Sequence, residues 1–265
     1  MLKSLGHQLL ACGKNGIPAQ ITFGNNKYRL SKIFKHDFFA ATALYKAERK
    51  SQAAKNQNPA RIILKLNRQQ HFLGLPLAWL GKILCCHEVY IIRCLSHLQG
   101  IPSFLSYYGK TGFIYEYVEG CPLDKDKKLP DDFFDKLLYL LRQIHQRDIV
   151  YLDMNKRSNI LLGSDKKPYL VDFQISLHIG EHLLIWRWLS KYLRDTLQRA
   201  DIYHLFKHKR KLCPHLLKPH EQALSRHISG LIRLHRLAAT PLRNLRRALL
   251  KYLHTKGLAA TERET

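Results

Sequence analysis

Apolar positions follow a strand-like pattern in the first part of the chain. Three short runs, 28–34, 61–66 and 112–118, are rich in β-branched, aromatic and leucine residues. A segment with apolar residues three and four positions apart, roughly 81–98, lies between the last two runs. The pattern predicts a β-rich first part that contains one helix.

The pattern becomes helical after residue 130. Asp131 and Asp132 precede an amphipathic run at 133–145, which predicts a capped helix. Two short apolar runs, 160–162 and 169–171, flank a turn rich in Gly, Ser, Asp, Lys and Pro, which predicts a hairpin. After the hairpin, from about Leu183, the period is helical almost to the end of the chain.

No internal repeat or low-complexity linker divides the 265 residues. We therefore expect a single α+β unit with two closely packed lobes, a β-rich one at about 20–120 and a helical one at about 121–265. A cleft between such lobes is the default place for a binding site.

Charge adds a constraint on partners. Lysine and arginine number 44 against 20 acidic residues, a formal net charge of +24. The excess lies in residues 1–120 and 174–265, whereas 121–173 is nearly neutral. So large a charge implies an anionic partner: nucleic acid, an acidic membrane surface or a phosphorylated substrate. The longest apolar stretch, around 72–80, is too short to span a membrane.

The six cysteines show no C-x-x-C pair and no repeated spacing. Buried free thiols in a reducing compartment are therefore expected. A cytoplasmic location follows, with peripheral attachment to the inner face of the membrane as an open alternative.

The nearly neutral middle and the segment before it carry candidate chemistry. Phosphoryl transfer from ATP needs a lysine for the phosphates, a carboxylate to hold that lysine, metal ligands and an acceptor base. The sequence offers these types in order: Lys65 after three aliphatic residues, Glu88 on the following helix, Asp153 with Asn159, and Asp172 before Phe173-Gln174. In order and near spacing, these residues resemble the protein-kinase-like superfamily.

The resemblance implies a bilobal kinase-like fold, with ATP and Mg²⁺ as cofactors. Lys65 would bind the ATP phosphates and Glu88 would orient it. Asp153 would be the catalytic base, and Asn159 and Asp172 would hold magnesium.

Two further segments carry expected supporting roles. The run Tyr115–Gly120 is similar to the hinge that binds adenine through backbone groups, with Glu116 and Val118 as the contacts. Asp201 resembles the aspartate of the central helix that braces the catalytic loop through backbone hydrogen bonds, and His145 is expected to support the same loop.

The phosphate loop departs from the family pattern. No G-x-G-x-x-G occurs in the first lobe, and its place is taken by residues 35–42. Ala40 and Ala41 are small enough there for backbone amides to approach a phosphate.

The catalytic loop departs as well. Tyr151 replaces the family's histidine, and Asn159 lies six residues after Asp153, one more than usual, so the loop must bulge. Asn155 is a reserve metal ligand. Gln174 replaces a flexible glycine, which argues against a flipping switch at Asp172.

The interval between Asp172 and Asp201 is short and lacks an A-P-E motif. It leaves little chain for a regulated activation segment or a peptide-docking platform. The chain therefore resembles compact atypical bacterial kinases: those acting on Kdo or heptose sugars of the lipopolysaccharide core, the RIO type, and antibiotic-type phosphotransferases.

Residues 183–253 mix cations with large apolar residues, including Trp186, Trp188 and the run Lys207–Lys211. Further cations recur at helical spacing at Arg233, Arg236, Arg243, Arg246, Arg247 and Lys251. One interpretation places both tryptophans in the core and the cations on a solvated face. The alternative is docking on an anionic membrane surface, with RNA as the other anionic option.

Three functions stay open at this point. The first is a monomeric kinase acting on a sugar hydroxyl of the lipopolysaccharide core or a similar membrane glycolipid. The second is a RIO-like serine/threonine protein kinase or ATPase bound to ribonucleoprotein. The third is a non-catalytic kinase-like binding module.

Overall fold

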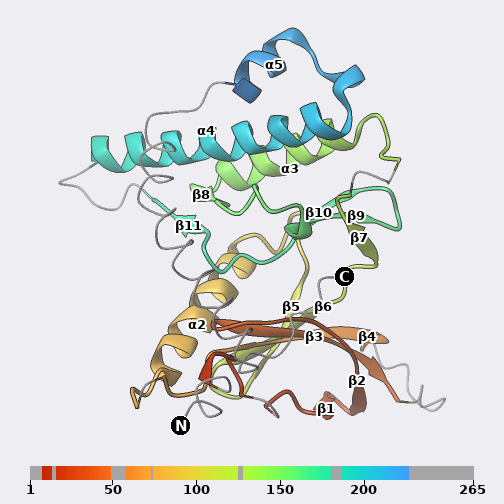
Figure 1. Cartoon of the computed structure of the whole chain (residues 1–265), viewed down its shortest axis with the longest axis vertical. Coiled ribbons are helices and arrows are strands. Elements are labelled where there is room, and N and C mark those ends of the chain that lie inside the picture. Colours follow the sequence, from red (N-terminus) through yellow and green to blue (C-terminus); the bar gives the residue numbers. More distant parts are fainter. Residues whose placement is uncertain are drawn as a thin grey trace, which may run out of the picture. The chain divides into compact units, whose positions relative to one another are not determined.

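The structure, a computed structural model, describes residues 8–13, 16–48, 58–72, 74–124, 128–180 and 187–226, except for the side chain of Arg187. They form two compact units. Of the described residues, the first unit holds those up to Val89 together with Phe104–Tyr117, and the second holds Tyr90–Ser103 and those from Val118 onward. Strands and helices are both abundant, so the α+β class is confirmed (Figure 1).

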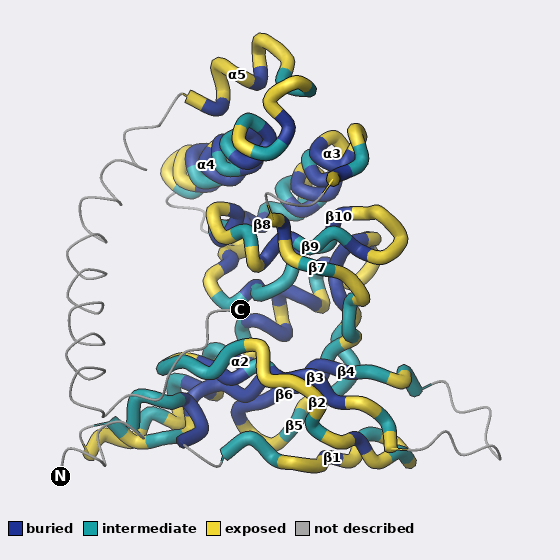
Figure 2. The backbone as a smooth tube through the Cα atoms, turned by 45° about the vertical axis from the view of Figure 1, so that its right-hand side comes forward, coloured by how far each residue is buried: buried dark blue, intermediate teal, exposed yellow. Residues whose placement is uncertain are grey.

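The first unit is built on one antiparallel sheet of six strands in the order β1-β2-β3-β4-β6-β5. The strands are β1 (Gln20–Phe23), β2 (Asn26–His36), β3 (Ala40–Ala47), β4 (Arg61–Asn67), β5 (Phe104–Tyr108) and β6 (Gly112–Glu116). Strands β3 and β4 are buried along most of their length, whereas most of β2 is exposed (Figure 2).

One face of this sheet carries a hydrophobic core. Its members include Ile21, Tyr28, Ala41, Ala43, Tyr45, Ile62, Leu64, Leu66 and Ile114. They come from alternate positions of neighbouring strands, as the two-residue period of a strand requires. Lys65 lies between Leu64 and Leu66 and therefore belongs to the opposite face.

Strand β3 was not predicted, because its four alanines in eight residues dilute the β-branched signal. Tertiary pairing with β2 and β4 on both sides makes it a strand. The residues expected to replace a glycine-rich loop are therefore the end of β2, a tight turn at 37–39, and the start of β3.

Helix α2 (Ala78–Cys94) starts three residues before the predicted boundary, directly after Leu75-Pro76-Leu77. Its continuation to residue 98 was wrong: Leu95–Leu98 form tight turns instead. The division between the units falls within this helix, after Val89, so the last turn of α2 groups with the second unit. The predicted boundary at 120/121 lies close to the observed one after Tyr117.

The helices of the second unit are α3 (Phe133–His145), α4 (Arg187–Leu212) and α5 (Pro219–Arg226), with 3-10 turns at η1 (Arg157–Asn159) and η3 (Pro214–Leu216). Helix α3 has the predicted bounds, but the predicted cap is wrong: Asp132 is the N-cap residue and its side chain makes no capping hydrogen bond. The helix buries Phe134, Leu137, Leu141 and Ile144, residues three and four apart on one face. An ion pair of 2.6 Å between Asp132 and Lys136 joins its first turn to the preceding residue.

The strands of the second unit are short: β7 (Gly120–Pro122), β8 (Ile149–Val150), β9 (Ile160–Gly163), β10 (Pro168–Leu170) and β11 (Leu177–His178). The predicted hairpin is confirmed as the antiparallel pair β9–β10. Strand β11 pairs with β8 and so ties the segment after Asp172 to the start of the candidate catalytic loop. Among the described helices, none combines the length and the apolar character needed to cross a membrane.

Position 100 requires a glycine, because of its backbone conformation and because no space is left for a Cβ atom. Its φ is +98°, and a Cβ atom there would lie 2.7 Å from Leu140 Cδ2 and 2.8 Å from the carbonyl oxygen of Pro168. Its own carbonyl accepts a hydrogen bond from the Leu170 amide. This glycine therefore lets α3 and β10 pack against the chain that leaves α2.

Gly100→Ala is expected to lower the free energy of unfolding by roughly 2–4 kcal/mol, the sum of the left-handed backbone and the overpacking. Gly109→Ala is the matched control, because φ there is +61° and no atom lies within 4 Å of the added Cβ. Urea unfolding of both variants measures the difference, and equal losses would contradict the packing role of Gly100.

Candidate functional site

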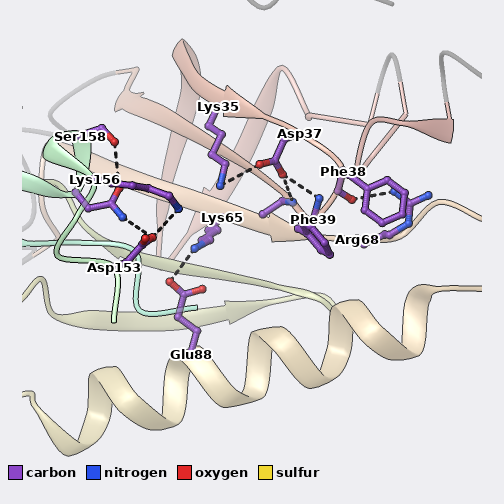
Figure 3. Close-up of polar contacts among 12 residues, drawn as sticks. Lys35, Asp37, Phe38, Phe39, Lys65, Arg68, Glu88, Asp153, Lys156 and Ser158 are labelled. Atoms are coloured by element: carbon purple, nitrogen blue, oxygen red, sulfur yellow. Dashed lines mark hydrogen bonds and ion pairs between the residues drawn. The ribbon is translucent and has the colours of Figure 1, made fainter. Parts of the chain in front are cut away.

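Lys65 and Glu88 form a buried ion pair in the first unit. The Lys65 Nζ atom, on β4, lies 2.8 Å from Glu88 Oε1, on α2 (Figure 3). Both residues are about 2 % exposed. Two buried charges are tolerated only when paired in this way. The predicted pairing is confirmed.

The candidate adenine-binding segment follows β6. Glu116 is the last residue of that strand and stands opposite Ile62 of β4. Val118 lies in the irregular segment between β6 and β7, directly after the boundary between the two units. Backbone binding of adenine by these residues stays a prediction.

The turn between β2 and β3 differs from the expectation. The Asp37 carboxylate accepts hydrogen bonds from the amides of Phe39, at 2.9 Å, and Ala40, at 3.0 Å. The Ala40 amide is therefore already donated, and Ala40 and Ala41 are buried in β3. The prediction that small residues expose amides to a phosphate here is wrong, because Asp37 occupies the anion-binding position of the turn.

Asp37 also pairs with Lys35, whose Nζ lies 3.1 Å from Asp37 Oδ2 (Figure 3). Burial by itself would raise the pKa of Asp37, but Lys35 and the two amides outweigh burial and lower the pKa. Asp37 is thus an ionised residue that sequence reasoning missed. The signal was present, since aspartate often accepts hydrogen bonds from amides two and three residues ahead.

In the second unit, Asp153 lies at the centre of the candidate catalytic loop. Its Oδ2 accepts hydrogen bonds from Asn159 Nδ2 at 2.7 Å and from Lys156 Nζ at 2.6 Å. Asp153 and Asn159 are buried. Turn η1, which ends at Asn159, takes up the extra residue of the loop. Lys156, visible in the sequence as a lysine three residues after Asp153, was missed.

Asn159 and Asp172 are the predicted magnesium ligands, and both side chains carry oxygen atoms. The Asn159 side chain turns its Nδ2 to Asp153, and its Oδ1 accepts from Ser158 Oγ at 3.3 Å. Asp172 follows β10 with a φ of +63°. The reserve candidate Asn155 instead accepts a hydrogen bond from Lys207 at 2.9 Å.

The donor types fit magnesium, which takes hard oxygen ligands from one or two side chains together with substrate phosphates and water. Such a site needs no dense protein cage. Within the part of the chain that the structure describes, no three His, Cys, Asp or Glu side chains gather as metal ligands.

Asp201 organises the backbone of the loop from α4. Its two carboxylate oxygens accept the amides of Leu152, at 2.9 Å, and Tyr151, at 2.8 Å, and His145 Nε2 lies 3.2 Å away. The predicted bracing is therefore confirmed for both His145 and Asp201. Burial raises the pKa of Asp201, and His145 and the two amides partly oppose that rise.

Tyr151 joins the loop to the segment that carries Asp172. Its buried hydroxyl donates to the carbonyl of Val171, and its ring packs edge-on against Phe173 with 5.1 Å between centroids. The Ser176 hydroxyl in turn donates to the Tyr151 carbonyl at 3.0 Å. A phenol thus links both segments around Asp153 and Asp172.

His208 of α4 was also missed. Its Nε2 donates to the Met154 carbonyl at 2.9 Å, next to Asp153, and the residue is 3 % exposed. Burial, together with nearby cations, lowers the pKa of His208 to about 4, and the hydrogen bond to Met154 opposes this only in part. The imidazole is therefore neutral at pH 7.

The basic run 207–211 is not a uniform surface. Lys209 is buried and pairs with Glu221 at 2.9 Å and Asp135 at 3.4 Å, and Arg210 bonds to Ser225. These cations attach α5 to α4, so the expectation that the whole run is a docking cluster is wrong. Lys211 is exposed. The recurring cations at 233–251 lie outside the described residues.

Trp188 does not fill the core. It is 70 % exposed, and Tyr192, Leu189 and Leu193 are exposed beside it in the first turns of α4. Spacings of one, four and five residues put these four side chains on one side of the helix. We call them the α4 aromatic face. Trp186 lies outside the described residues.

No protein-family model matches the chain, and no curated protein matches it. Function is therefore inferred from the Lys65–Glu88 pair of the first unit and the Asp153 cluster of the second.

His208 predicts a loss of stability in acid. The unfolded histidine has a pKa of about 6.5 and the folded one about 4, so the neutral form stabilises the fold above pH 6.5 and this contribution is lost as the pH falls toward 4. Between pH 7 and pH 5, wild type should lose about 2 kcal/mol more than His208→Gln. Urea unfolding at both pH values measures this, and equal pH dependence in the two proteins would refute it.

Proposed function

We propose that the protein is an ATP-dependent phosphotransferase of the protein-kinase-like superfamily, with a bilobal kinase-like fold. The observation that carries the proposal is the buried Lys65–Glu88 pair, which joins a strand to a helix over 23 residues of sequence. A lysine held by a buried carboxylate is the phosphate-binding arrangement that this chemistry needs.

The second unit supports the same proposal. Asp153 is positioned by Asn159 and Lys156, while Asp201 holds the backbone on which Asp153 stands. A carboxylate that must receive a proton from a hydroxyl has to be fixed in this manner.

In the proposed reaction, the acceptor hydroxyl gives its proton to Asp153 as its oxygen bonds to the γ-phosphorus of ATP. The bond from that phosphorus to the bridging oxygen of the β-phosphate breaks, and ADP leaves. Lys65 holds phosphate oxygens, and Lys156 offsets the negative charge beside Asp153. Magnesium, held by Asn159 and Asp172, would neutralise phosphate charge.

The presence of the charged residues that phosphoryl transfer needs favours an enzyme over a non-catalytic binding module. Lys65, Glu88 and Asp153 all survive, and the first two are buried as a pair at the cost of desolvation. A buried pair can be purely structural, as Lys209–Glu221 is between α4 and α5, so the preference for an enzyme rests on the Lys65–Glu88 pair together with Asp153.

We propose a sugar hydroxyl of the lipopolysaccharide core, or of a similar membrane glycolipid, as the acceptor. The stretch from Asp172 to the start of α4 at Arg187 is short for a peptide-docking platform. The α4 aromatic face adds a surface suited to the interface of a bilayer, where Trp and Tyr are enriched. The protein would then work as a monomer at the cytoplasmic side of the membrane.

Charge on α4 and α5 agrees with an anionic surface. Of the acidic residues on these helices, Asp201 and Glu221 are buried and only Asp195 reaches the surface. The exposed cations are Lys191, Arg199 and Lys211 on α4 and Arg226 on α5, with Lys218 directly before α5. A RIO-like protein kinase on ribonucleoprotein, favoured by the same positive charge, is the second candidate.

Removal of the base or of a metal ligand is expected to abolish transfer. Asp153→Asn and Asp172→Asn should each lower turnover by about 100-fold or more, because the proton acceptor or the phosphate-neutralising ion is lost. Transfer from γ-labelled ATP to cell-envelope, ribosomal and protein fractions measures this.

Asp148→Asn is the matched control for this experiment. Asp148 lies five residues before Asp153, has a φ of 57° that asparagine tolerates, and pairs with Arg194 at 2.6 Å. Turnover should persist in this variant. Loss of transfer with Asp148→Asn and retention with Asp153→Asn would show that the proposed register is wrong.

The membrane proposal predicts salt-sensitive binding to anionic vesicles through the α4 aromatic face. Trp188→Ala with Tyr192→Ala should weaken binding to phosphatidylglycerol vesicles about tenfold or more, since two interfacial rings are lost. Raising the salt concentration should weaken it further, because exposed charges are screened over about 10 Å at 0.1 M.

Tyr139→Ala is the control, because Tyr139 is equally exposed, at 66 %, but lies on α3. Co-sedimentation measures all three proteins. Vesicle binding that ignores the α4 variants would contradict the membrane proposal, and salt-sensitive binding to ribosomes without vesicle binding would favour the RIO-like alternative.

A further inference from the structure

A second lysine lies on the same face of the first-unit sheet as Lys65. The pairing register places Lys35 of β2 opposite Thr42 of β3, and Thr42 opposite Lys65 of β4. Residues directly opposite on antiparallel strands share a face. Lys35, Thr42 and Lys65 therefore form one row across three strands, with about 10 Å between the backbones of the two lysines.

This face is distinct from the one that holds the hydrophobic core. Ala41 and Ala43, the neighbours of Thr42, both belong to the core, so Thr42 points away from it. The row thus combines a buried cation, a half-buried hydroxyl and a second cation that reaches solvent.

Two register shifts occur along β2, one between Leu30 and Lys32 and one between Ile33 and Lys35. The first puts Ile33 opposite Ala43, and the second restores the alternation, so that Lys35 lies opposite Thr42 and His36 opposite Ala41. Lys35 therefore points to the same side of the sheet as Thr42 and Lys65.

The adjacent turn has no amide to offer at Phe39 or Ala40, since both are donated to Asp37. These two amides therefore cannot bind a phosphate as the amides of a glycine-rich loop do. Lys35 is the cation at that position: it is the next-to-last residue of β2, and its side chain is 37 % exposed while paired with Asp37.

We propose that Lys35 is a second phosphate-binding lysine, which contacts the phosphate chain of the nucleotide beside Lys65. The inference rests on the proposed function, because it assigns a further ligand-binding residue to the same ATP site. Asp37 fixes the turn and holds Lys35 at the edge of the row until phosphate oxygens compete for its ammonium group.

Lys65 and Lys35 differ in burial and in freedom of movement, and this fits different roles in binding phosphate. Lys65 is buried and held by Glu88, so its ammonium has a fixed position. Lys35 is a flexible point charge with a solvent-facing head, and it can follow phosphate groups of different lengths. Its contribution is therefore expected to depend on how many phosphates the nucleotide carries.

The test measures binding of ATP with magnesium, ADP with magnesium, and adenosine by titration calorimetry. Lys35→Met should weaken ATP binding about tenfold, as expected for one charge-assisted contact, and weaken ADP binding less. Adenosine binding should stay unchanged. Lys35→Arg should restore most of the ATP affinity, since the charge returns.

Lys46→Met is the matched control. Lys46 is exposed on the same face of β3, four residues from Thr42 and thus about 13 Å along the strand, and it carries the same charge. Its ATP affinity should equal that of wild type. An equal loss in both variants would reduce the effect to net charge and overturn the inference.

The remaining outcomes separate the two levels of the proposal. Wild type that binds neither ATP nor ADP overturns the proposed function and this inference with it. If wild type and Lys35→Met bind ATP equally tightly, the inference alone is overturned. A Lys35→Met variant that loses ATP and adenosine affinity equally also overturns it, because a phosphate contact cannot act on adenosine.

Discussion

The second unit depends on the buried carboxylate of Asp201. Two consecutive amides, those of Tyr151 and Leu152, converge on its oxygens, and this requires Leu152 to adopt a left-handed backbone with φ of 64°. Such a conformation costs a non-glycine residue roughly 1–2 kcal/mol. The hydrogen bonds from these two amides to Asp201 help to offset that cost. Asp153 follows Leu152 directly, so the position of the candidate base is set by a residue on another helix.

Leu152 is not the only residue near this loop with a left-handed backbone. Asp148 and Asp172 also have positive φ values, of 57° and 63°, and each sits beside the same loop in sequence or through hydrogen bonds. Tyr151 donates to Val171, and Ser176 donates back to Tyr151, so the segments around Asp153 and Asp172 hold each other. Left-handed residues cluster where surrounding contacts over-determine the backbone, and such clusters are typical of functional sites. The second unit thus contains a constrained loop that ordinary packing alone does not require.

Which elements could be predicted from the sequence depends on whether the signal that specifies each one is local. Helix α3 and the β9–β10 hairpin were predictable, because their signals are local: an apolar stripe and a turn rich in Gly, Asp and Pro. The Lys65–Glu88 and Asp201 contacts were predictable only through the resemblance, since nothing local links residues 23 or 50 positions apart. Strand β3 and the burial of Lys209 were not predictable. An alanine-rich strand forms because its neighbours pair with it, and a lysine in a basic run becomes structural only when Glu221 of α5 meets it.

At the turn 37–39, the hydrogen bonds to Asp37 go together with large side chains where a phosphate-binding loop needs small ones. A loop that binds phosphate with its amides must keep small residues, so that the backbone can approach the anion. Here Asp37 takes those amides, and the turn is free to carry bulk: Phe38 packs against Phe72 with 5.2 Å between centroids and lies 3.7 Å from the Arg68 guanidinium. Arg68 is itself fully buried and donates to the Phe38 carbonyl. The turn is therefore held by side-chain contacts and by Asp37, and the amides of Phe39 and Ala40 are not open to a phosphate.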